Sequence, residues 1–379
     1  MTDWGNCMGR AADDRFAHWP PLPARLLLAA LLALMAMAAL VPIGTGSKTI
    51  STPAFGQQPA AERARDDDLA LYDVATVRIR GGQNYYDFIA EEHRRSGYPL
   101  QPGLAVRLPT LAYLDAALGD MGQAAASIAL MLAVLAAWWR RLGPEPTGEP
   151  GGMPRRTLAL AFLFIGVSLG TNRHFFVLHE LWSGMLLALA FGLHRPGKWV
   201  LPVLVTALAL AIREHALPFA LLMGAMACWR RDWKEVAAWA LLTVAFFVGL
   251  AIHLHLVAQH VLPTDGHSAS WFALRGLSGW LSNVVLSSNL RFLPHFIAGP
   301  LVVLMVLGWA GWRSAAGTFG TLLYLGYALA FMIAGRDDNY YWGAMVAPAM
   351  FIGLAFVPRA LQSLWRASFD KLRMSGDIA

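Results

Sequence analysis

The chain has 379 residues, of which 57% are hydrophobic and only 14% are charged. Soluble domains usually carry about 25% charged and about 45–50% apolar residues, so this composition excludes a disordered chain and disfavours an ordinary soluble one. The net charge is +6, and we assign the excess of Lys and Arg to loops on the cytoplasmic side of a membrane rather than to nucleic-acid binding. The two cysteines, Cys7 and Cys228, provide neither a disulfide framework nor a cysteine-based metal site.

Ten apolar stretches are long enough to cross a bilayer where the protein shields their ends. The sequence therefore predicts an all-α, polytopic integral membrane protein of about ten transmembrane helices, at 25–43, 121–139, 157–171, 175–193, 199–212, 216–229, 236–257, 294–312, 318–334 and 343–358. The first stretch follows a leader too long for a signal peptide, so we keep it as a helix. The chain then divides into an N-terminal tail (1–24), a first span (25–43), an outer loop (44–120), a helical core (121–358) and a basic C-terminal tail (359–379).

Basic residues orient these spans. With the N-terminus in the cytoplasm, more than half of the 30 Lys and Arg residues fall in inner segments, in clusters such as Arg140-Arg141 and Arg230-Arg231. Beyond the long first loop, each outer connection has only one or two arginines. This alternation predicts an inner-membrane protein with both termini in the cytoplasm.

The first outer loop contains two short helical patterns. Leu69, Tyr72, Thr76 and Ile79 repeat at helical spacing, and Gly81-Gly82 is typical of a helix end. The second pattern starts near Gln83. Its apolar face is formed by Tyr85, Phe88 and Ile89, and Glu91 can pair with Arg95 at i, i+4. We expect both helices to lie along the membrane surface.

Acidic residues at the start of the first pattern allow two interpretations. Asp66, Asp67 and Asp68 suit a solvated helix N-terminus, where the macrodipole favours negative charge. A carboxylate facing a cleft can instead take a proton from an acceptor hydroxyl. On that interpretation Asp68 is the expected catalytic base, with Asp67 or Asp73 as rivals.

Charged residues flank several spans that are short for a bilayer. The stretch 199–212 has 14 residues, about 21 Å of helix against roughly 30 Å of hydrocarbon. Arg213-Glu214 and Arg173 are therefore expected to lie below the outer headgroups, with Glu180 also inside the apolar region. Either Arg213 pairs with Glu180 or Glu214 to hold helices together, or the arginines line an outward-facing cavity and bind a phosphate.

A second polar cluster follows the ninth predicted span. An aromatic belt explains its rings alone, whereas a sugar site also explains the amide and carboxylate groups of Asp338, Asn339, Tyr341 and Trp342. Asp337-Asp338 is weak support for a divalent cation. The histidines at 253, 255, 260 and 267 share no helix face, so we predict no metal site and no required cofactor.

Several short motifs resemble the C-type (GT-C fold) membrane glycosyltransferases, which use polyprenyl-phosphate-linked sugars. The resemblance rests on the overall order of spans and on five motifs: Asp68-x-x-x-Tyr72, Gly81-Gly82-Gln83-Asn84-Tyr85-Tyr86, Arg107-Leu108-Pro109, Arg213-Glu214 and Gly335-Arg336-x-Asp338-Asn339-x-Tyr341-Trp342-Gly343. It implies that an outer-loop acid such as Asp68 is the base. It also implies that Arg213 and Arg336, with Arg173, hold the donor phosphate.

The expected activity is therefore transfer of a sugar, with inversion, from a polyprenyl phosphate to a lipid, glycan or protein acceptor on the outer face of the membrane. No GxxxxGK[ST] or GxGxxG motif is present, and a donor delivered by the bilayer needs none. A transporter or flippase of an anionic lipid is the alternative, because it would use the same arginines without a base. The sequence leaves the oligomeric state undetermined.

Overall fold

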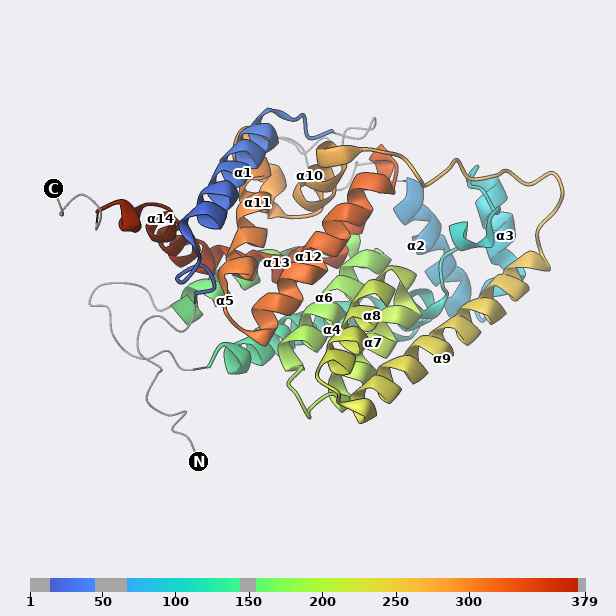
Figure 1. Cartoon of the computed structure of the whole chain (residues 1–379). Coiled ribbons are helices and arrows are strands. Elements are labelled where there is room, and N and C mark those ends of the chain that lie inside the picture. The colour runs from blue at the N-terminus through green and yellow to red at the C-terminus, as the bar shows by residue number, and fades with distance from the viewer. Residues whose placement is uncertain (1–13, 45–66, 144–154, 374–379) are drawn as a thin grey trace. The chain divides into compact units, whose positions relative to one another are not determined.

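A computed structural model describes residues 14–44, 67–143 and 155–373, and within these ranges the chain is helical and forms no β-strand. The all-α prediction is confirmed for these residues. Figure 1 shows the helices in chain order, from α1 (Pro21–Leu40) to α14 (Val357–Arg373).

Five helical segments are long and apolar enough to cross a membrane, so the prediction of ten spans is not confirmed. They are Pro21–Leu40, Gly103–Leu142, Trp233–Ala258, Ala315–Ile333 and Ala347–Phe369. Three further apolar helices are shorter, namely α6 (His179–Leu193), α7 (Val200–Ile212) and α11 (His295–Gly311). Length and composition of these segments are those of a membrane protein.

Other predicted spans differ from the observed elements. The stretches predicted at 157–171 and 216–229 form the 13-residue helices α5 (Arg155–Val167) and α8 (Leu217–Trp229). The stretch predicted at 343–358 is divided among the 3-10 helices η7 (Asp337–Met345) and η8 (Phe351–Phe356), the short α13 (Ala347–Met350) and α14. Helix α10 (Gly276–Leu286) was not predicted at all.

Helix α9 (Trp233–Ala258) exposes most of its apolar side chains. Only four of its 26 residues are buried, and Leu241, Val244 and Ile252 are all more than half exposed. An exposed apolar surface of this length is unfavourable in water and favourable in hydrocarbon. The exposed positions of α9 are therefore the surface that we expect lipid to cover.

The chain forms two compact units, each made of separate stretches of sequence. Of the described residues, unit 1 comprises 14–44, 138–143, 155–167 and 273–373, and unit 2 comprises 67–137 and 168–272. Unit 1 contains α1, α5, the helices α10, α11 and α12 (Ala315–Ile333), and the segments from η7 to α14. Unit 2 contains α2 (Asp67–Arg80), α3 (Tyr85–Arg95) and the helices from α6 to α9.

Close backbone contact holds unit 1 together around Trp309. The indole of Trp309 is fully buried, lies edge-on to the ring of Trp138 and donates a hydrogen bond from Nε1 to the carbonyl oxygen of Met350 at 3.0 Å. At the adjacent Gly308, a Cβ atom would lie 1.8 Å from the carbonyl oxygen of Gly353. Small residues are required where helix backbones approach this closely.

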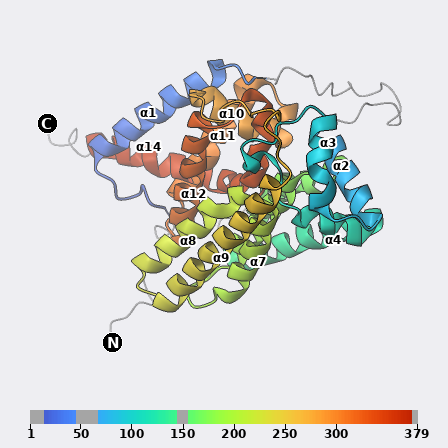
Figure 2. The same cartoon turned by 90° about the vertical axis from the view of Figure 1, so that its right-hand side faces the viewer.

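In unit 2, α2 and α3 lie side by side (Figure 1 and Figure 2). The end of α2 and the start of α3 lie within two residues of the positions expected from sequence. The predicted pair of Glu91 and Arg95 forms at 2.5 Å. The apolar face of α3 does not lie open for a membrane surface, because Tyr85, Phe88 and Ile89 are buried in a core that includes Val257 of α9. The expectation of two free surface helices is thus corrected for α3.

The long α4 (Thr110–Leu142) contains a break at Gly119. This residue has φ 63° and ψ 177°, a conformation accessible to glycine and strained for other residues. The break separates a first segment, Thr110–Leu118, from the apolar remainder of the helix. That first segment supplies several residues of the site described below.

Candidate functional site

A buried cluster of charged side chains lies in unit 2 where α6 begins and α7 ends. Arg213 is 1% exposed, and its Nε atom lies 2.7 Å from Oε1 of Glu180, a residue of the first turn of α6. Its Nη1 atom donates a hydrogen bond of 2.5 Å to Oε1 of Glu214. The predicted pairing of Arg213 with Glu180 or Glu214 is confirmed, and both partners are used.

Two further residues extend this cluster. Nη2 of Arg107 lies 3.8 Å from Oε1 of Glu180, and Nε of Arg107 donates a hydrogen bond of 2.9 Å to the hydroxyl of Tyr72. Nδ1 of His215 lies 3.2 Å from Oε1 of Glu214. The two guanidinium groups balance the two carboxylates, which makes this burial of charge tolerable.

The local sequence explains why these groups meet. A short turn closed by the hydrogen bond from Lys198 N to Arg195 O links α6 to α7, so the start of α6 lies beside the end of α7. The hydroxyl of Ser183 donates a hydrogen bond of 3.0 Å to the carbonyl oxygen of Ala209, which fixes the two helices at this level. Arg213 then leaves the helix with an extended backbone (φ −148°, ψ 120°).

Arg213 is not fully hydrogen-bonded, because its Nε atom lies close to Glu180 without forming a hydrogen bond. Its Nη2 atom is buried and has no hydrogen-bond partner among the described residues. A buried donor without a partner is costly, typically by about 1–3 kcal/mol and more for a charged group. The cluster therefore holds a guanidinium edge that is suited to an additional anionic oxygen.

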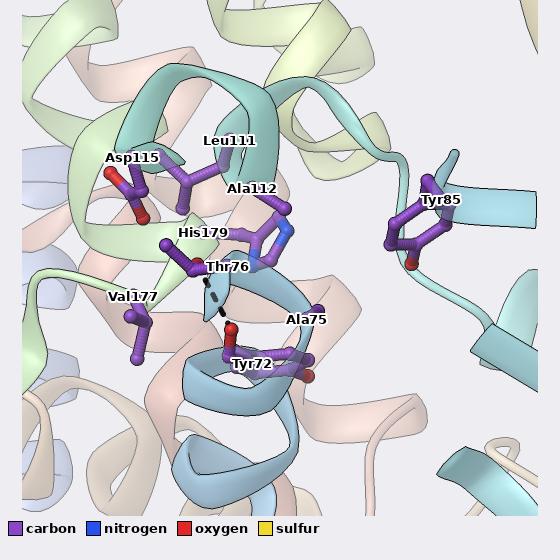
Figure 3. A pocket seen from close by; sticks show the side chains of 9 residues that line it. All are labelled: Tyr72, Ala75, Thr76, Tyr85, Leu111, Ala112, Asp115, Val177 and His179. Atoms are coloured by element: carbon purple, nitrogen blue, oxygen red, sulfur yellow. Dashed lines mark hydrogen bonds between the residues drawn. The ribbon is translucent and has the colours of Figure 1, made fainter. Parts of the chain in front are cut away.

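A small pocket lies next to this cluster (Figure 3). Its volume is about 10 Å³, room for roughly one water molecule. The first segment of α4 contributes Asp115, α2 contributes Tyr72 and Thr76, and α6 contributes His179. Oδ1 of Asp115 and both ring nitrogens of His179 are buried without a hydrogen-bond partner in the described part of the chain.

The acidic residues predicted as base lie on α2. Asp67 and Asp68 are in its first turn, but their side chains lie outside the described part of the structure. Asp73 is partly exposed, and its charge acts on Asp115. Asp66 lies outside the described residues. The assignment of the base to Asp68, Asp67 or Asp73 stays a prediction.

Arg336 and the residues that follow it lie in unit 1 and bond to one another. Nε of Arg336 lies 3.2 Å from Oδ1 of Asp338, and the backbone N–H of Arg336 donates to the side chain of Asn339 at 3.1 Å. Nδ2 of Asn339 donates to the hydroxyl of Tyr341 at 3.3 Å. Trp342 is buried, with its ring beside Gly335. These groups form a folded turn, and their predicted role in sugar binding stays a prediction.

Arg173 is exposed and lies 3.7 Å from Asp120, itself exposed. Its predicted contact with the donor phosphate stays a prediction.

In unit 1, Asp337 pairs with Arg275 at 3.0 Å, so both carboxylates of the Asp337-Asp338 pair have a cationic neighbour. Among the described residues, no three His, Cys, Asp or Glu side chains come together as a metal site.

Sequence reasoning missed Asp115 and His179 and did not assign Arg107 a place in the site. Asp115 stands four residues after Leu111 and three after Ala112, both buried. It therefore lies on the buried face of its helix, and this spacing was the available signal.

Comparison with protein-family models, with curated proteins and with solved structures finds no match for this chain.

Proposed function

We propose that the protein is a membrane glycosyltransferase that moves a sugar from a polyprenyl-phosphate donor to an acceptor hydroxyl on the outer face of the membrane. The observation that carries this proposal is the buried guanidinium of Arg213, with Nη2 unpartnered among the described residues. A guanidinium edge matches phosphate oxygens well. The apolar helices of the chain support the proposal, since a bilayer around them would deliver a lipid-linked phosphate.

The carboxylates around Arg213 have a positioning role in this proposal. Glu180 makes an ion pair with Arg213 at Nε, and Glu214 accepts a hydrogen bond from Nη1. In this proposal the two carboxylates orient the guanidinium so that Nη2 meets the ligand. A group held in place before the reaction stabilises developing charge without reorganisation. Arg107 adds a second positive charge near Glu180, with Nη2 lying 3.8 Å from Oε1.

The proposed reaction follows from these groups. A carboxylate of the predicted outer loop (44–120) takes the proton of the acceptor hydroxyl, whose oxygen attacks the anomeric carbon. The bond from that carbon to the phosphate oxygen breaks, and its electron pair leaves with the polyprenyl phosphate. Nη2 of Arg213 stabilises the charge on the departing phosphate. Attack opposite the leaving group inverts the anomeric centre.

A binding experiment tests the phosphate site. The full chain in lipid nanodiscs is titrated with undecaprenyl phosphate and with undecaprenol, and binding is followed by tryptophan fluorescence. We expect the phosphate to bind at least about tenfold tighter, since hydrogen bonds to charged groups contribute about 1.5–3 kcal/mol. Arg213→Lys should remove this preference, because a lysine cannot reproduce the planar fork.

The matched control is Arg230→Lys. Arg230 is a partly buried arginine of the same unit, and like Arg213 it pairs with a buried carboxylate, Glu235, at 2.8 Å. This variant should keep the preference for phosphate. Equal binding of the two lipids by the unmodified protein would contradict the proposal. A preference for phosphate accompanied by lipid movement across the bilayer, without any release of sugar, would favour the transporter.

A further inference from the structure

The first segment of α4 presents a carboxylate to the interior of unit 2. Asp115 is 1% exposed, and its Oδ1 atom has no hydrogen-bond partner among the described residues. Its backbone carbonyl is occupied, since it accepts hydrogen bonds from Nη2 of Arg80 at 3.1 Å and from Nε2 of Gln123 at 3.3 Å. The helix is thus fixed in place while the carboxylate oxygen stays available. A buried polar atom of this kind needs an explanation.

The pocket beside Asp115 offers space for one small polar group. Its other polar wall residues are Tyr72, Thr76 and His179, with apolar side chains around them. The hydroxyl of Thr76 is already used, because it donates to the carbonyl oxygen of Tyr72 at 3.0 Å. The groups available to a ligand are therefore the oxygen of Asp115 and the nitrogens of His179. The carboxylate oxygen of Asp115 accepts a hydrogen bond, and each imidazole nitrogen of His179 can donate or accept one. Together these groups suit a water molecule or an alcohol hydroxyl.

Residues that line the pocket are next to residues of the arginine cluster within unit 2. His179 directly precedes Glu180, which contacts Arg213. Tyr72 has its ring edge-on to His179, with centroids 5.0 Å apart, and its hydroxyl accepts from Arg107. A hydroxyl in the pocket would therefore lie next to the group that we propose for the phosphate.

We infer that this pocket is the subsite for the acceptor hydroxyl and that Asp115, rather than an acid of α2, receives its proton. This inference rests on the proposed function. The proton passes from the acceptor oxygen to the carboxylate of Asp115, and this oxygen bonds to the anomeric carbon. The bond between the anomeric carbon and the phosphate oxygen breaks, and its electron pair leaves with the phosphate. His179 holds the acceptor oxygen in line. Asp73 is partly exposed and lacks the enclosure that a base of this kind needs.

Turnover measurements on the full chain in nanodiscs test the subsite. The donors are undecaprenyl phosphates bearing mannose, glucose, galactose or aminoarabinose, with water and a lipid extract of the expression host as acceptors. Released undecaprenyl phosphate is measured by mass spectrometry. Asp115→Asn should lower the rate by at least about 100-fold, the usual contribution of a general base. The same variant should keep the preference for undecaprenyl phosphate over undecaprenol. The matched variant Asp87→Asn, at an exposed carboxylate of α3, should stay within about threefold of the unmodified protein, because the remaining machinery is intact.

A rescue experiment separates proton transfer from a structural role. Asp115→Ala vacates the space of a carboxylate beside the pocket, and sodium formate is added to replace it. Formate should restore part of the turnover of Asp115→Ala and have no effect on Asp87→Ala. A structural role would not produce rescue. Thermal unfolding of each variant in nanodiscs checks that it is folded.

The outcomes distinguish the two proposals. If Asp115→Asn turns over at the unmodified rate while Arg213→Lys does not, the subsite is wrong and the glycosyltransferase proposal stands. If the unmodified protein releases undecaprenyl phosphate from none of the four donors, the proposed function fails and the subsite fails with it. If Asp115→Asn is folded and inactive but formate does not rescue Asp115→Ala, Asp115 is not the proton acceptor.

Discussion

Two buried carboxylates of unit 2 differ in how completely they are bonded. Glu235 is fully buried and accepts hydrogen bonds from Arg230 at 2.8 Å and Trp239 at 3.2 Å, with Nε2 of His194 at 2.7 Å. Asp115 is equally buried, yet its Oδ1 atom has no partner in the described ranges. A fully bonded carboxylate stabilises the junction of helices. An incompletely bonded one points to a ligand.

Sequence predicted the ion pairs of Arg213 and missed the buried carboxylate of Asp115. Arg213-Glu214 follows a span that is too short for the bilayer, so depth alone signalled an ion pair. Asp115 is a single acid in the stretch Leu111–Leu118, which resembles an ordinary helix leading into a span. Its burial results from packing against α2, whose position depends on tertiary contacts that no local pattern encodes.

The burial of His93 predicts a pH-dependent stability. His93 of α3 is 4% exposed, and burial lowers its pKa from 6.5 to about 4, although the carbonyl oxygen of Pro99 lies 3.2 Å from Nδ1. The folded state therefore holds this ring neutral where the unfolded chain takes up a proton. Its contribution is complete above about pH 6.5 and decreases as the pH falls toward about 4.

Thermal unfolding followed by tryptophan fluorescence at a series of pH values measures this dependence. His93→Gln should flatten the loss of stability between about pH 6.5 and about pH 4 relative to the unmodified protein. The exposed His260 provides the control, and His260→Gln should leave the curve unchanged. An identical pH dependence of His93→Gln and the unmodified protein would contradict the assignment.

At the level of elements, periodicity succeeded where one face of a helix is buried. The apolar spacing of α2 and α3 predicted both helices and the end of the first near Gly81. It failed for α10, which is buried all round from Gly279 to Val285 and therefore shows no polar face. It also failed at 343–358, where Gly343 and Gly353 pack directly against carbonyl oxygens of other helices and the chain changes to 3-10 geometry.

The break in α4 yields a prediction at the same level. Gly119→Ala should destabilise the protein by about 1–3 kcal/mol, because the conformation of Gly119 is strained for any residue with a Cβ atom. No atom lies within 4 Å of a Cβ at this position, so the cost comes from the backbone alone. Unfolding by a graded mole fraction of dodecyl sulfate, followed by circular dichroism, measures it.

Gly249 of α9 is the matched control. It also has no atom within 4 Å of a Cβ, but its backbone is helical. Gly249→Ala should stabilise the protein by about 0.5–1 kcal/mol through helix propensity. Equal effects of the two substitutions would show that the break at Gly119 does not persist in the membrane.

For the whole molecule, hydropathy identified the apolar stretches and not their grouping. Each unit gathers segments that are far apart in sequence, and no window of residues contains that information. The ten spans expected from hydropathy are also not confirmed among the described residues. Several apolar stretches, such as α5 and α8 with 13 residues each, are shorter than the length expected of a spanning helix.

The exposed face of α9 supports a prediction about membrane insertion. Val244 lies near the middle of α9 and is 59% exposed. Val244→Arg should reduce insertion, since an arginine at the centre of a spanning helix costs about 2.5–3.5 kcal/mol. The fraction of full-length chain that resists alkaline extraction from membranes reports this change. Gln259→Arg, just beyond the end of α9, should have little effect. Full insertion of Val244→Arg would show that lipid does not contact this face.

Helix α1 packs against α11 and α14, and Nε of its Arg25 donates a hydrogen bond of 2.8 Å to the carbonyl oxygen of Ser368. During synthesis, α1 leaves the ribosome long before these partners exist. Unit 1 therefore cannot close until translation reaches the C-terminus. Until then, the small and apolar surfaces of α1 that later receive α11 must be covered by lipid or by the insertion machinery. Premature termination before α14 would leave α1 without at least one of its two partners and expose the nascent chain to membrane proteolysis.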